Sequence, residues 1–337
     1  MLNVVVMGNG WAAEMHIRAF QKLADVNVVA VCGHNYENAA RVASKYTVPN
    51  IYTDHNQMLR EQKADIAVVC TPNYLHCAMS IDAMRAGADV LCEKPAAINS
   101  DEIDSMINIQ QSTGKKLVIA HQKRFTTEAK YLKTIISKGV LGEVYNVHSQ
   151  WVRCQGIPGI GGWFTDKSRS GGGALIDIGV HILDLSMWFL DFPETKTICG
   201  ICGSRFGHNG LGAGNFGRRV SGESFVYDVD DHASAQIITT NGISIQLQCA
   251  WAAHVKEERF NVELWGDKCG ASLCPPEIYS SSKSYCAADI PSISLVNEYD
   301  LQAADFVNYC VSGDPKYLCT AEQALKVMKI IETIYGR

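Results

Sequence analysis

Short apolar runs alternate with helix-like amphipathic stretches along the first 120 residues. The run LNVVVM opens the chain, and further apolar runs follow at 26–32, 64–70, 89–95 and 115–121. Between them, apolar residues recur at helical spacing over 35–46, 76–88 and 99–113. Continuous apolar strands separated by helices are typical of a parallel sheet that is covered on both faces. The pattern therefore predicts an α/β domain over residues 1–122.

A glycine-rich turn joins the first strand to the first helix. Gly8, Asn9, Gly10, Trp11 and Ala12, followed by Ala13, form a G-x-G-x-x-A sequence. In a dinucleotide-binding Rossmann fold, the first glycine permits the tight turn and the second lets the backbone approach a pyrophosphate, which binds the free N–H groups at the helix N-terminus. A generic tight turn would explain the glycines alone. The strand before them and the helix after them favour a nicotinamide cofactor site.

The end of the second strand bears on the choice between NAD and NADP. NAD sites usually carry an acidic residue there, which holds the ribose 2′-hydroxyl. This chain has Gly33, His34 and Asn35 instead, with no Asp or Glu before Glu37. The missing carboxylate removes repulsion against a 2′-phosphate, and His34 could face one, so the sequence favours NADP and leaves NAD open.

The pattern changes at about residue 123. A helix capped near Gly139 leads to an alternating strand at 145–152, and further strands are expected at 234–251, with Asn241-Gly242 as a two-residue hairpin turn, at 259–266 and at 270–274. This pattern predicts an α+β domain over 123–337 with a large, mainly antiparallel sheet, one face of which is free for another subunit. The glycine-rich stretch 203–232 is expected to be a long loop that shapes a pocket or an interface. The last helix, 321–335, has a core-facing apolar stripe and is expected to pack back toward the Rossmann domain.

Composition and charge narrow the class of protein. The chain has 337 residues, enough for two domains, and its apolar fraction of 47% is that of a globular protein. No apolar run reaches the ~18–20 residues of a membrane span, and the N-terminus is a strand rather than a signal peptide. A net charge of −5 argues against a nucleic-acid partner. The thirteen cysteines are scattered, which fits reduced, buried thiols in a cytoplasmic protein and no metal site, and the Cys199–Cys202 pair lacks a second pair for zinc.

The stretch GGGALIDIGVH, residues 171–181, places two ionisable groups in apolar surroundings. Asp177 and His181 are four residues apart, which puts them on one face of a helix. Buried ionisable groups are costly unless they are paired or used. An internal hydrogen-bonded pair is one explanation and a catalytic pair is the other. Lys94, directly after a buried strand at the ligand-binding edge of a parallel sheet, favours the catalytic one.

Several motifs together resemble one enzyme family. The Gly8–Ala13 turn, TPNYLH (71–76), CEKP (92–95), HQKRF (121–125) and GGGALIDIGVHILDL (171–185) are similar to those of the Gfo/Idh/MocA oxidoreductases, which include glucose–fructose oxidoreductase and inositol dehydrogenases. The resemblance covers nearly the whole chain. It implies that Lys94, Asp177 and His181 are catalytic. It also implies that the nicotinamide cofactor is lined by Thr71, Pro72, Asn73, His76, Glu93 and Lys94, that Trp163 lies near the nicotinamide, and that the protein is a homodimer or homotetramer.

These residues suit hydride transfer between nicotinamide C4 and a CH–OH carbon. An imidazole, with an ordinary pKa of ~6.5, is matched to acid–base work near neutral pH, and the Lys94 ammonium would stabilise a developing alkoxide or share the proton. Asp177 would orient the imidazole or bind a substrate hydroxyl. The expected substrate is a sugar, amino sugar or cyclitol. The alternatives are a glycosidase that oxidises its substrate transiently with bound NAD, and a non-catalytic regulator that binds the nicotinamide.

Overall fold

The chain folds into two compact units. A computed structural model describes residues 1–215, 225–282, 284–288 and 296–337. The first unit comprises Met1–Phe125 and Val296–Leu325, and the second comprises Thr126–Leu295 and Lys326–Arg337. The chain first passes from one unit to the other at Phe125/Thr126, close to the boundary expected at 122/123. Residues 296–325, however, belong to the first unit rather than to the second.

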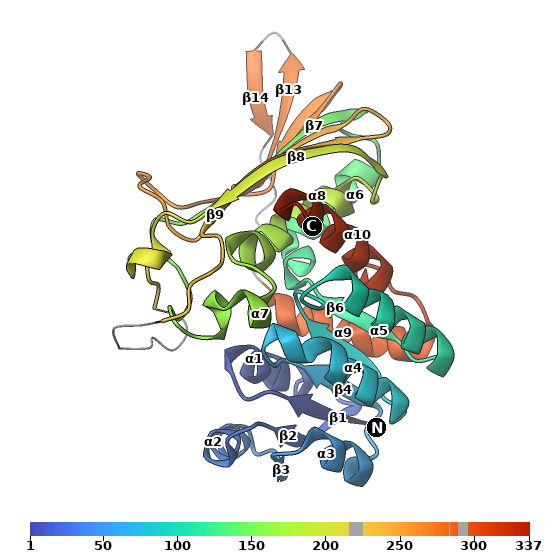
Figure 1. Ribbon diagram of the computed structural model, residues 1–337. Coiled ribbons are helices and arrows are strands. Elements are labelled where there is room, and N and C mark those ends of the chain that lie inside the picture. The colour runs from blue at the N-terminus through green and yellow to red at the C-terminus, as the bar shows by residue number, and fades with distance from the viewer. Residues whose placement is uncertain (216–224, 283, 289–295) are drawn as a thin grey trace. The chain divides into compact units, whose positions relative to one another are not determined.

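The first unit is built on a seven-stranded sheet (Figure 1). The strand order is β15-β6-β5-β4-β1-β2-β3, and every pairing is parallel except that of β15 with β6. The strands are β1 (Leu2–Met7), β2 (Val26–Cys32), β3 (Asn50–Tyr52), β4 (Ile66–Val69), β5 (Asp89–Glu93), β6 (Leu117–Ala120) and β15 (Cys319–Thr320). β1, β4 and β6 each have a neighbouring strand on both sides, and nearly all their side chains are buried, as expected for largely apolar strands.

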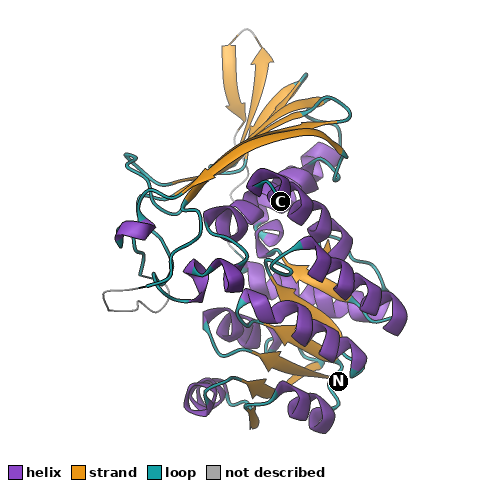
Figure 2. Cartoon of the chain, in the orientation of Figure 1, coloured by secondary structure: helices purple, strands orange, loops and turns teal. Residues whose placement is uncertain are grey.

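Helices cover both faces of this sheet (Figure 2). They are α1 (Trp11–Phe20), α2 (Tyr36–Tyr46), α3 (His55–Gln62), α4 (His76–Arg85), α5 (Ser100–Thr113) and α9 (Glu298–Ser312). Asn35, Asp54 and Asn99 cap α2, α3 and α5 by accepting hydrogen bonds from first-turn N–H groups.

The late segment belongs to the first unit because its apolar face completes that unit's core. Tyr299, Ala303 and Phe306 of α9 are buried in the same cluster as Ile17 and Phe20 of α1. Cys319 and Thr320 then pair with β6. This part of the Rossmann core is therefore contributed from the far end of the sequence.

The second unit contains an eight-stranded sheet in the described part of the chain. Its order is β14-β13-β12-β11-β7-β10-β9-β8, and all pairings are antiparallel except that of β7 with β10. The strands are β7 (Val144–Val152), β8 (Thr195–Gly203), β9 (His232–Thr239), β10 (Ser244–Ala250), β11 (Arg259–Gly266), β12 (Cys269–Ser272), β13 (Glu277–Ser282) and β14 (Ser284–Ala288). The prediction of a Rossmann domain followed along the chain by a domain with a mainly antiparallel sheet is confirmed.

Helices of the second unit lie on one side of this sheet (Figure 1). They are α6 (Thr127–Ser137), α7 (Lys167–Ser170), the π-helical turn η4 (Leu175–Gly179), α8 (Val180–Phe189) and the later part of α10 (Ala321–Tyr335). The segment Lys167–Phe189 is long and apolar enough to cross a membrane, but 94% of its most apolar 18-residue window is buried inside the protein. It is placed as the core helix of a globular domain would be.

The hairpin at Asn241-Gly242 differs slightly from the expected form. β9 and β10 pair antiparallel, and Gly242 has a positive φ of 86°. The connection is longer than a two-residue turn, because Thr239 closes it by bonding Ile243 through both its backbone N–H and its hydroxyl.

Candidate active site

The glycine turn after β1 has the geometry of a dinucleotide site. Gly8 has a φ of 121°, and a Cβ there would come closer than 3.0 Å to the Cys70 carbonyl. Gly10, which has no side chain to cap α1, stands at the N-cap position of that helix. A Cβ at Gly10 would meet nothing within 4 Å. Packing within the protein therefore explains Gly8, whereas Gly10 leaves open space at a helix N-terminus, which fits the approach of a pyrophosphate.

The end of β2 carries no carboxylate at positions 33–35. A Cβ at Gly33 would collide with the side chain of Asn9, so the glycine lets Asn9 lie against the end of the strand. His34 is exposed, and Asn35 caps α2. Gly33 thus lies against Asn9 of the Gly8–Gly10 turn, and His34 follows it directly in the chain.

Glu93, the residue before Lys94, forms a buried contact with His16. Glu93, the last residue of β5, is 7% exposed, and its Oε1 lies 2.8 Å from Nε2 of the fully buried His16 on α1. The Lys94 N–H donates to the other oxygen of Glu93. Burial raises the pKa of Glu93, but the hydrogen bond from His16 and the charges of His16 and Lys94 outweigh it, so the pKa is lowered overall. Glu93 is thus an ionised anchor, and the half-buried Lys94 follows it directly.

His76 links the two loops that follow β4 and β5. Its Nδ1 lies 2.7 Å from the Pro95 carbonyl oxygen and its Nε2 lies 2.8 Å from the Thr71 carbonyl oxygen, with the ring 1% exposed. Both partners only accept hydrogen bonds, so both contacts are fully made only by the doubly protonated ring. Burial lowers the pKa of His76, and the two carbonyls oppose that shift. Both ring nitrogens thus face carbonyls inside the protein, which places His76 between Thr71 and Pro95, and its role toward a cofactor stays a prediction.

We expect His76→Phe to weaken both folding and nicotinamide binding. The phenyl ring fills the space but has no N–H, so the Pro95 and Thr71 carbonyls lose the donor that the imidazole supplies between them. An unsatisfied buried group costs about 1–3 kcal/mol. Urea unfolding should show a lower free energy of unfolding, and fluorescence titration should show a higher Kd for the reduced nicotinamide cofactor. His55→Phe is the control, because His55 pairs with the partly exposed Asp82. Unchanged stability and Kd in His76→Phe would contradict the linking role.

Each of the three glycines before Asp177 has a reason within the protein. Gly171 ends α7 in the left-handed region, with a φ of 84°. A Cβ at Gly172 would collide with the Tyr335 ring, and one at Gly173 would collide with the Asp230 backbone. A run of glycines can also let a ligand approach the backbone closely. The close neighbours of Gly172 and Gly173 are instead parts of the second unit itself.

Asp177 and His181 follow on η4 and α8, among aromatic side chains. The Trp251 indole N–H donates to Asp177 Oδ2 at 2.8 Å, and the His181 ring lies 5.4 Å from the Trp151 ring. Asp177 is partly exposed, whereas His181 is 3% exposed. π-Helical turns occur often at functional sites, where they displace a side chain from regular helical spacing. The pair is thus held at defined positions rather than on a freely exposed helix face.

Of the remaining predicted residues, Thr71, Pro72 and Asn73 lie in the first unit and Trp163 lies in the second. Asn73 is buried at the start of the short helix Asn73–Leu75, after Thr71 and Pro72. Trp163 begins another short helix in the second unit and stacks on Phe164, with ring centres 3.7 Å apart. The roles of all these residues toward a cofactor stay predictions.

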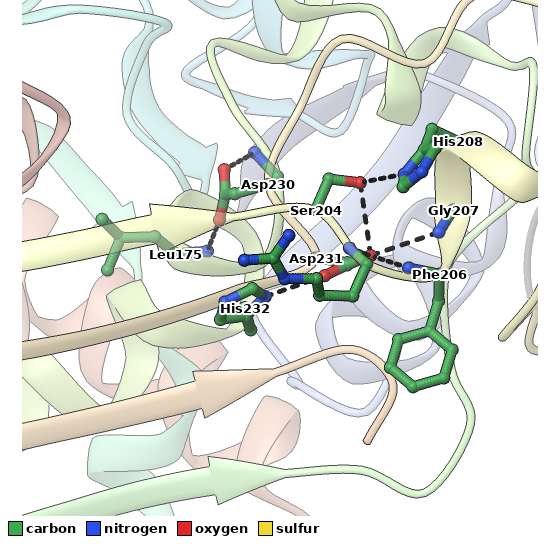
Figure 3. Close-up of polar contacts among 10 residues, drawn as sticks. Leu175, Ser204, Phe206, Gly207, His208, Asp230, Asp231 and His232 are labelled. Carbon is green, nitrogen blue, oxygen red and sulfur yellow. Dashed lines mark hydrogen bonds and ion pairs between the residues drawn. The ribbon is translucent and has the colours of Figure 1, made fainter. Parts of the chain in front are cut away.

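Two residues that the sequence did not single out contact the segment around Asp177 in the second unit. Trp251 is fully buried after β10, and Asp230 binds the backbone ahead of η4 (Figure 3). Trp251 lies 74 residues from its partner Asp177, and Asp230 lies 55 residues from its partner Leu175. No local sequence pattern could therefore indicate these contacts. The expected loop 203–232 is described only in part, since residues 216–224 lie outside the described residues.

Comparisons with known proteins agree across both units. The family profile described as "Oxidoreductase family, NAD-binding Rossmann fold" matches residues 2–121, and that of the "GFO/IDH/MocA C-terminal domain" matches residues 129–272. D-Glucoside 3-dehydrogenase of Escherichia coli K12 is 32% identical over 99% of this chain and 94% of its own length. A putative UDP-kanosamine synthase oxidoreductase subunit of Amycolatopsis mediterranei is 31% identical over 99% and 95%.

Solved structures show the same fold at lower identity. A levoglucosan dehydrogenase in complex with NADH and levoglucosan superposes with a TM-score of 0.85 at 19% identity, covering 99% of this chain and 96% of that one. The profiles, the full-length relatives and the fold agree with the motifs at Gly8–Ala12, 92–95 and 171–185. The chain belongs to the Gfo/Idh/MocA family of oxidoreductases, with an NAD-binding Rossmann domain.

Proposed function

We propose that the protein oxidises or reduces a secondary hydroxyl carbon of a sugar ring with a nicotinamide cofactor. The observation that carries the proposal is the 32% identity, over nearly the full length of both chains, to a D-glucoside 3-dehydrogenase. Relatives named for a UDP-linked amino sugar and for levoglucosan widen the class to pyranosides and related sugars. Cyclitols remain within it, because inositol 2-dehydrogenases are 25% identical over 58% of the chain.

The Rossmann residues would hold the cofactor. The open space at Gly10 and the free N–H groups at the start of α1 suit a pyrophosphate. Gly33 and His34 would face the adenosine ribose, and the missing carboxylate there supports acceptance of NADP beside NAD. Thr71, Pro72 and Asn73 would line the nicotinamide half, and the buried His76 would support it by holding the Thr71 loop. When bound, the nicotinamide supplies the hydride acceptor or donor.

Lys94 and His181 would handle the proton of the reacting hydroxyl. In oxidation, the imidazole of His181 takes the proton and the Lys94 ammonium stabilises the alkoxide that forms, and reduction reverses both roles. Glu93, ionised beside His16, fixes the backbone at Lys94. Asp177, held by Trp251, would bind a neighbouring hydroxyl or orient His181. Trp151 packs beside His181, and Phe260 and the Arg153 guanidinium also lie against its ring, so these groups would help to fix the imidazole.

A substrate panel tests this function. The purified protein is mixed with NAD or NADP and with methyl glucosides, free hexoses, levoglucosan or myo-inositol, and formation of the reduced cofactor is followed by absorbance. Steady formation with a sugar supports the dehydrogenase, and the ratio of kcat/KM for the two cofactors decides between NAD and NADP. Release of free sugar from a glycoside without net reduction would favour the glycosidase. Tight cofactor binding with no turnover on any substrate would favour the regulator.

We further propose that the protein is a homodimer or homotetramer, joined through the outer face of its large sheet. Neighbouring strands present exposed, uncharged side chains there around a hollow of about 440 Å³. They include Cys199 and Ile201 on β8, Ser234 and Gln236 on β9, and Gln246 and Gln248 on β10. Ile201 is 68% exposed. The cytoplasmic location stays a prediction, supported by the free thiols of the cysteines whose side chains are described.

We expect Ile201→Arg to dissociate the assembly. In an interface formed by the same face of two copies, each copy would contribute one arginine. An unpaired charge buried there is strongly unfavourable. Light scattering after gel filtration should give a multiple of 36.9 kDa for the parent protein and a single-chain mass for the variant. Val311→Arg, on α9 and 76% exposed, is the control. A parent protein that is already monomeric would refute the proposed interface.

A further inference from the structure

The carboxylate of Asp230 binds the backbone that leads into Asp177. Asp230 lies just ahead of β9 and is 8% exposed. Its Oδ1 accepts from the Gly173 N–H at 2.7 Å and its Oδ2 from the Leu175 N–H at 2.8 Å (Figure 3). The Tyr335 hydroxyl donates to Oδ1 at 2.7 Å, and the Ala174 N–H donates to the Asp230 backbone carbonyl at 3.0 Å. The whole turn from 173 to 175 is therefore held by one residue.

These are the N–H groups that a helix start leaves without an internal partner. The first N–H groups of a helix have no intrahelical acceptor, and a carboxylate at that end also interacts favourably with the helix dipole. Asp230 acts here as a cap supplied from 55 residues away. The Asp177 N–H also donates to the Gly173 carbonyl at 3.0 Å, so Asp177 is bonded to the same turn. The direction in which the segment leaves the turn thus depends on Asp230.

The next residue, Asp231, also accepts hydrogen bonds from backbone N–H groups, but from a different segment of the chain. Asp231 is fully buried, and its Oδ2 accepts from the Arg205, Phe206 and Gly207 N–H groups, while its Oδ1 lies 3.0 Å from Nδ1 of His232 (Figure 3). Adjacent carboxylates therefore hold two separate segments. A variant of Asp231 therefore serves as a comparison: it loses a buried carboxylate that binds residues 205–207 and His232 rather than the 173–175 turn.

We propose that Asp230 is a positioning residue, which sets the placement of Asp177 and His181 by capping the 173–175 turn while Tyr335 fixes its carboxylate. The consequence for turnover rests on the proposed function; the placement itself does not. Gly173 fits this role, since a side chain there would collide with the Asp230 backbone. Burial raises the pKa of Asp230, and the bonds from Leu175, Tyr335 and Gly173 oppose that shift.

Asp230→Asn tests the proposal with little change in volume. An amide cannot accept on both sides, so either Leu175 or Gly173 with Tyr335 would face an N–H₂ group. We expect kcat to fall on the order of 10²-fold, as for a displacement of about 1 Å at reacting groups, with an unchanged KM for the cofactor. Tyr335→Phe, which keeps the carboxylate and removes one donor, should give a smaller loss. Asp231→Asn should lower the melting temperature comparably but reduce kcat far less.

A spectroscopic readout separates placement from activity. The Trp251 indole N–H donates to Asp177, so its ¹H–¹⁵N resonance reports where Asp177 lies. Trp251→Phe assigns this signal among the six tryptophans. We expect the signal to shift in Asp230→Asn and to stay in place in Asp231→Asn. A signal unmoved in Asp230→Asn, with kcat per folded molecule no lower than in Asp231→Asn, would overturn the proposal. If the parent protein turns over none of the sugars, the proposed function fails, and the indole signal alone decides the placement.

Discussion

Lys94→Ala and His181→Ala are each expected to lower kcat by about 10²–10⁴-fold, the usual contribution of a positioned acid or base. Lys94→Ala removes the ammonium that would stabilise the alkoxide, and His181→Ala removes the group that would carry the proton. The Kd for the nicotinamide cofactor should change little, because the glycine turn and the start of α1 are untouched. Steady-state kinetics on the substrate found in the panel, together with fluorescence titration of the cofactor, measures both quantities.

Two surface variants serve as controls for this prediction. Lys22 pairs with Asp300 and His55 pairs with Asp82, both in partly exposed positions. Exposed pairs contribute about 0–1 kcal/mol, so Lys22→Ala and His55→Ala should keep normal turnover and stability. Near-normal turnover in both Lys94→Ala and His181→Ala would show that the acid–base assignment is wrong.

Gly173→Ala is expected to destabilise the protein strongly. The added methyl group would meet the carbonyl oxygen, carbonyl carbon and nitrogen of Asp230, all closer than 3.0 Å. These are backbone atoms, so they cannot rotate aside as a flexible side chain does. Overpacking typically costs about 1–3 kcal/mol, and we expect this variant at or above the upper end of that range. Thermal and urea unfolding measure the loss, and turnover should fall with it, because the turn leads into Asp177.

Gly10→Ala is the matched comparison, since the same methyl group there would meet nothing within 4 Å. Gly10 has a φ of −86°, which alanine adopts readily. The free energy of unfolding of the variant should therefore stay the same or rise by about 0.4–1 kcal/mol. Cofactor affinity should nevertheless fall, because the methyl group would occupy the space proposed for the pyrophosphate. A stable Gly173→Ala, or a Gly10→Ala with undiminished cofactor affinity, would contradict these explanations of the two glycines.

The sequence predicts the elements that have a local pattern. The strand expected at 26–32, the strand at 259–266 and the helix at 321–335 coincide with β2, β11 and α10. Each has a continuous or periodic arrangement of apolar residues. The glycine turn can be assigned because the strand before it and the helix after it are equally local. The short β3 and α3 are not among the predicted elements, although Asp54 is a recognisable N-cap for α3.

What cannot be predicted depends on contacts between distant residues. A regular helix is the simplest prediction for 174–185, and nothing in that stretch marks the π-helical turn at Leu175–Gly179. The reasons for Gly172 and Gly173 lie at Tyr335 and Asp230, far along the chain. The placement of α9 in the first unit likewise depends on Phe306 and Phe20 sharing one buried core. Apolar periodicity shows that a face is buried but not what buries it.

The return of residues 296–325 to the first unit has a consequence for biosynthesis. The ribosome releases Met1–Phe125 first, yet α9 and β15, which complete that unit's core and the edge of its sheet, emerge after Thr126–Leu295 has been made. At about 5–20 residues per second, that interval is on the order of ten seconds or longer. Throughout it, the nascent Rossmann half exposes the apolar surface around Phe20 and the unpaired edge of β6, so this half is expected to depend on chaperones until translation is nearly finished.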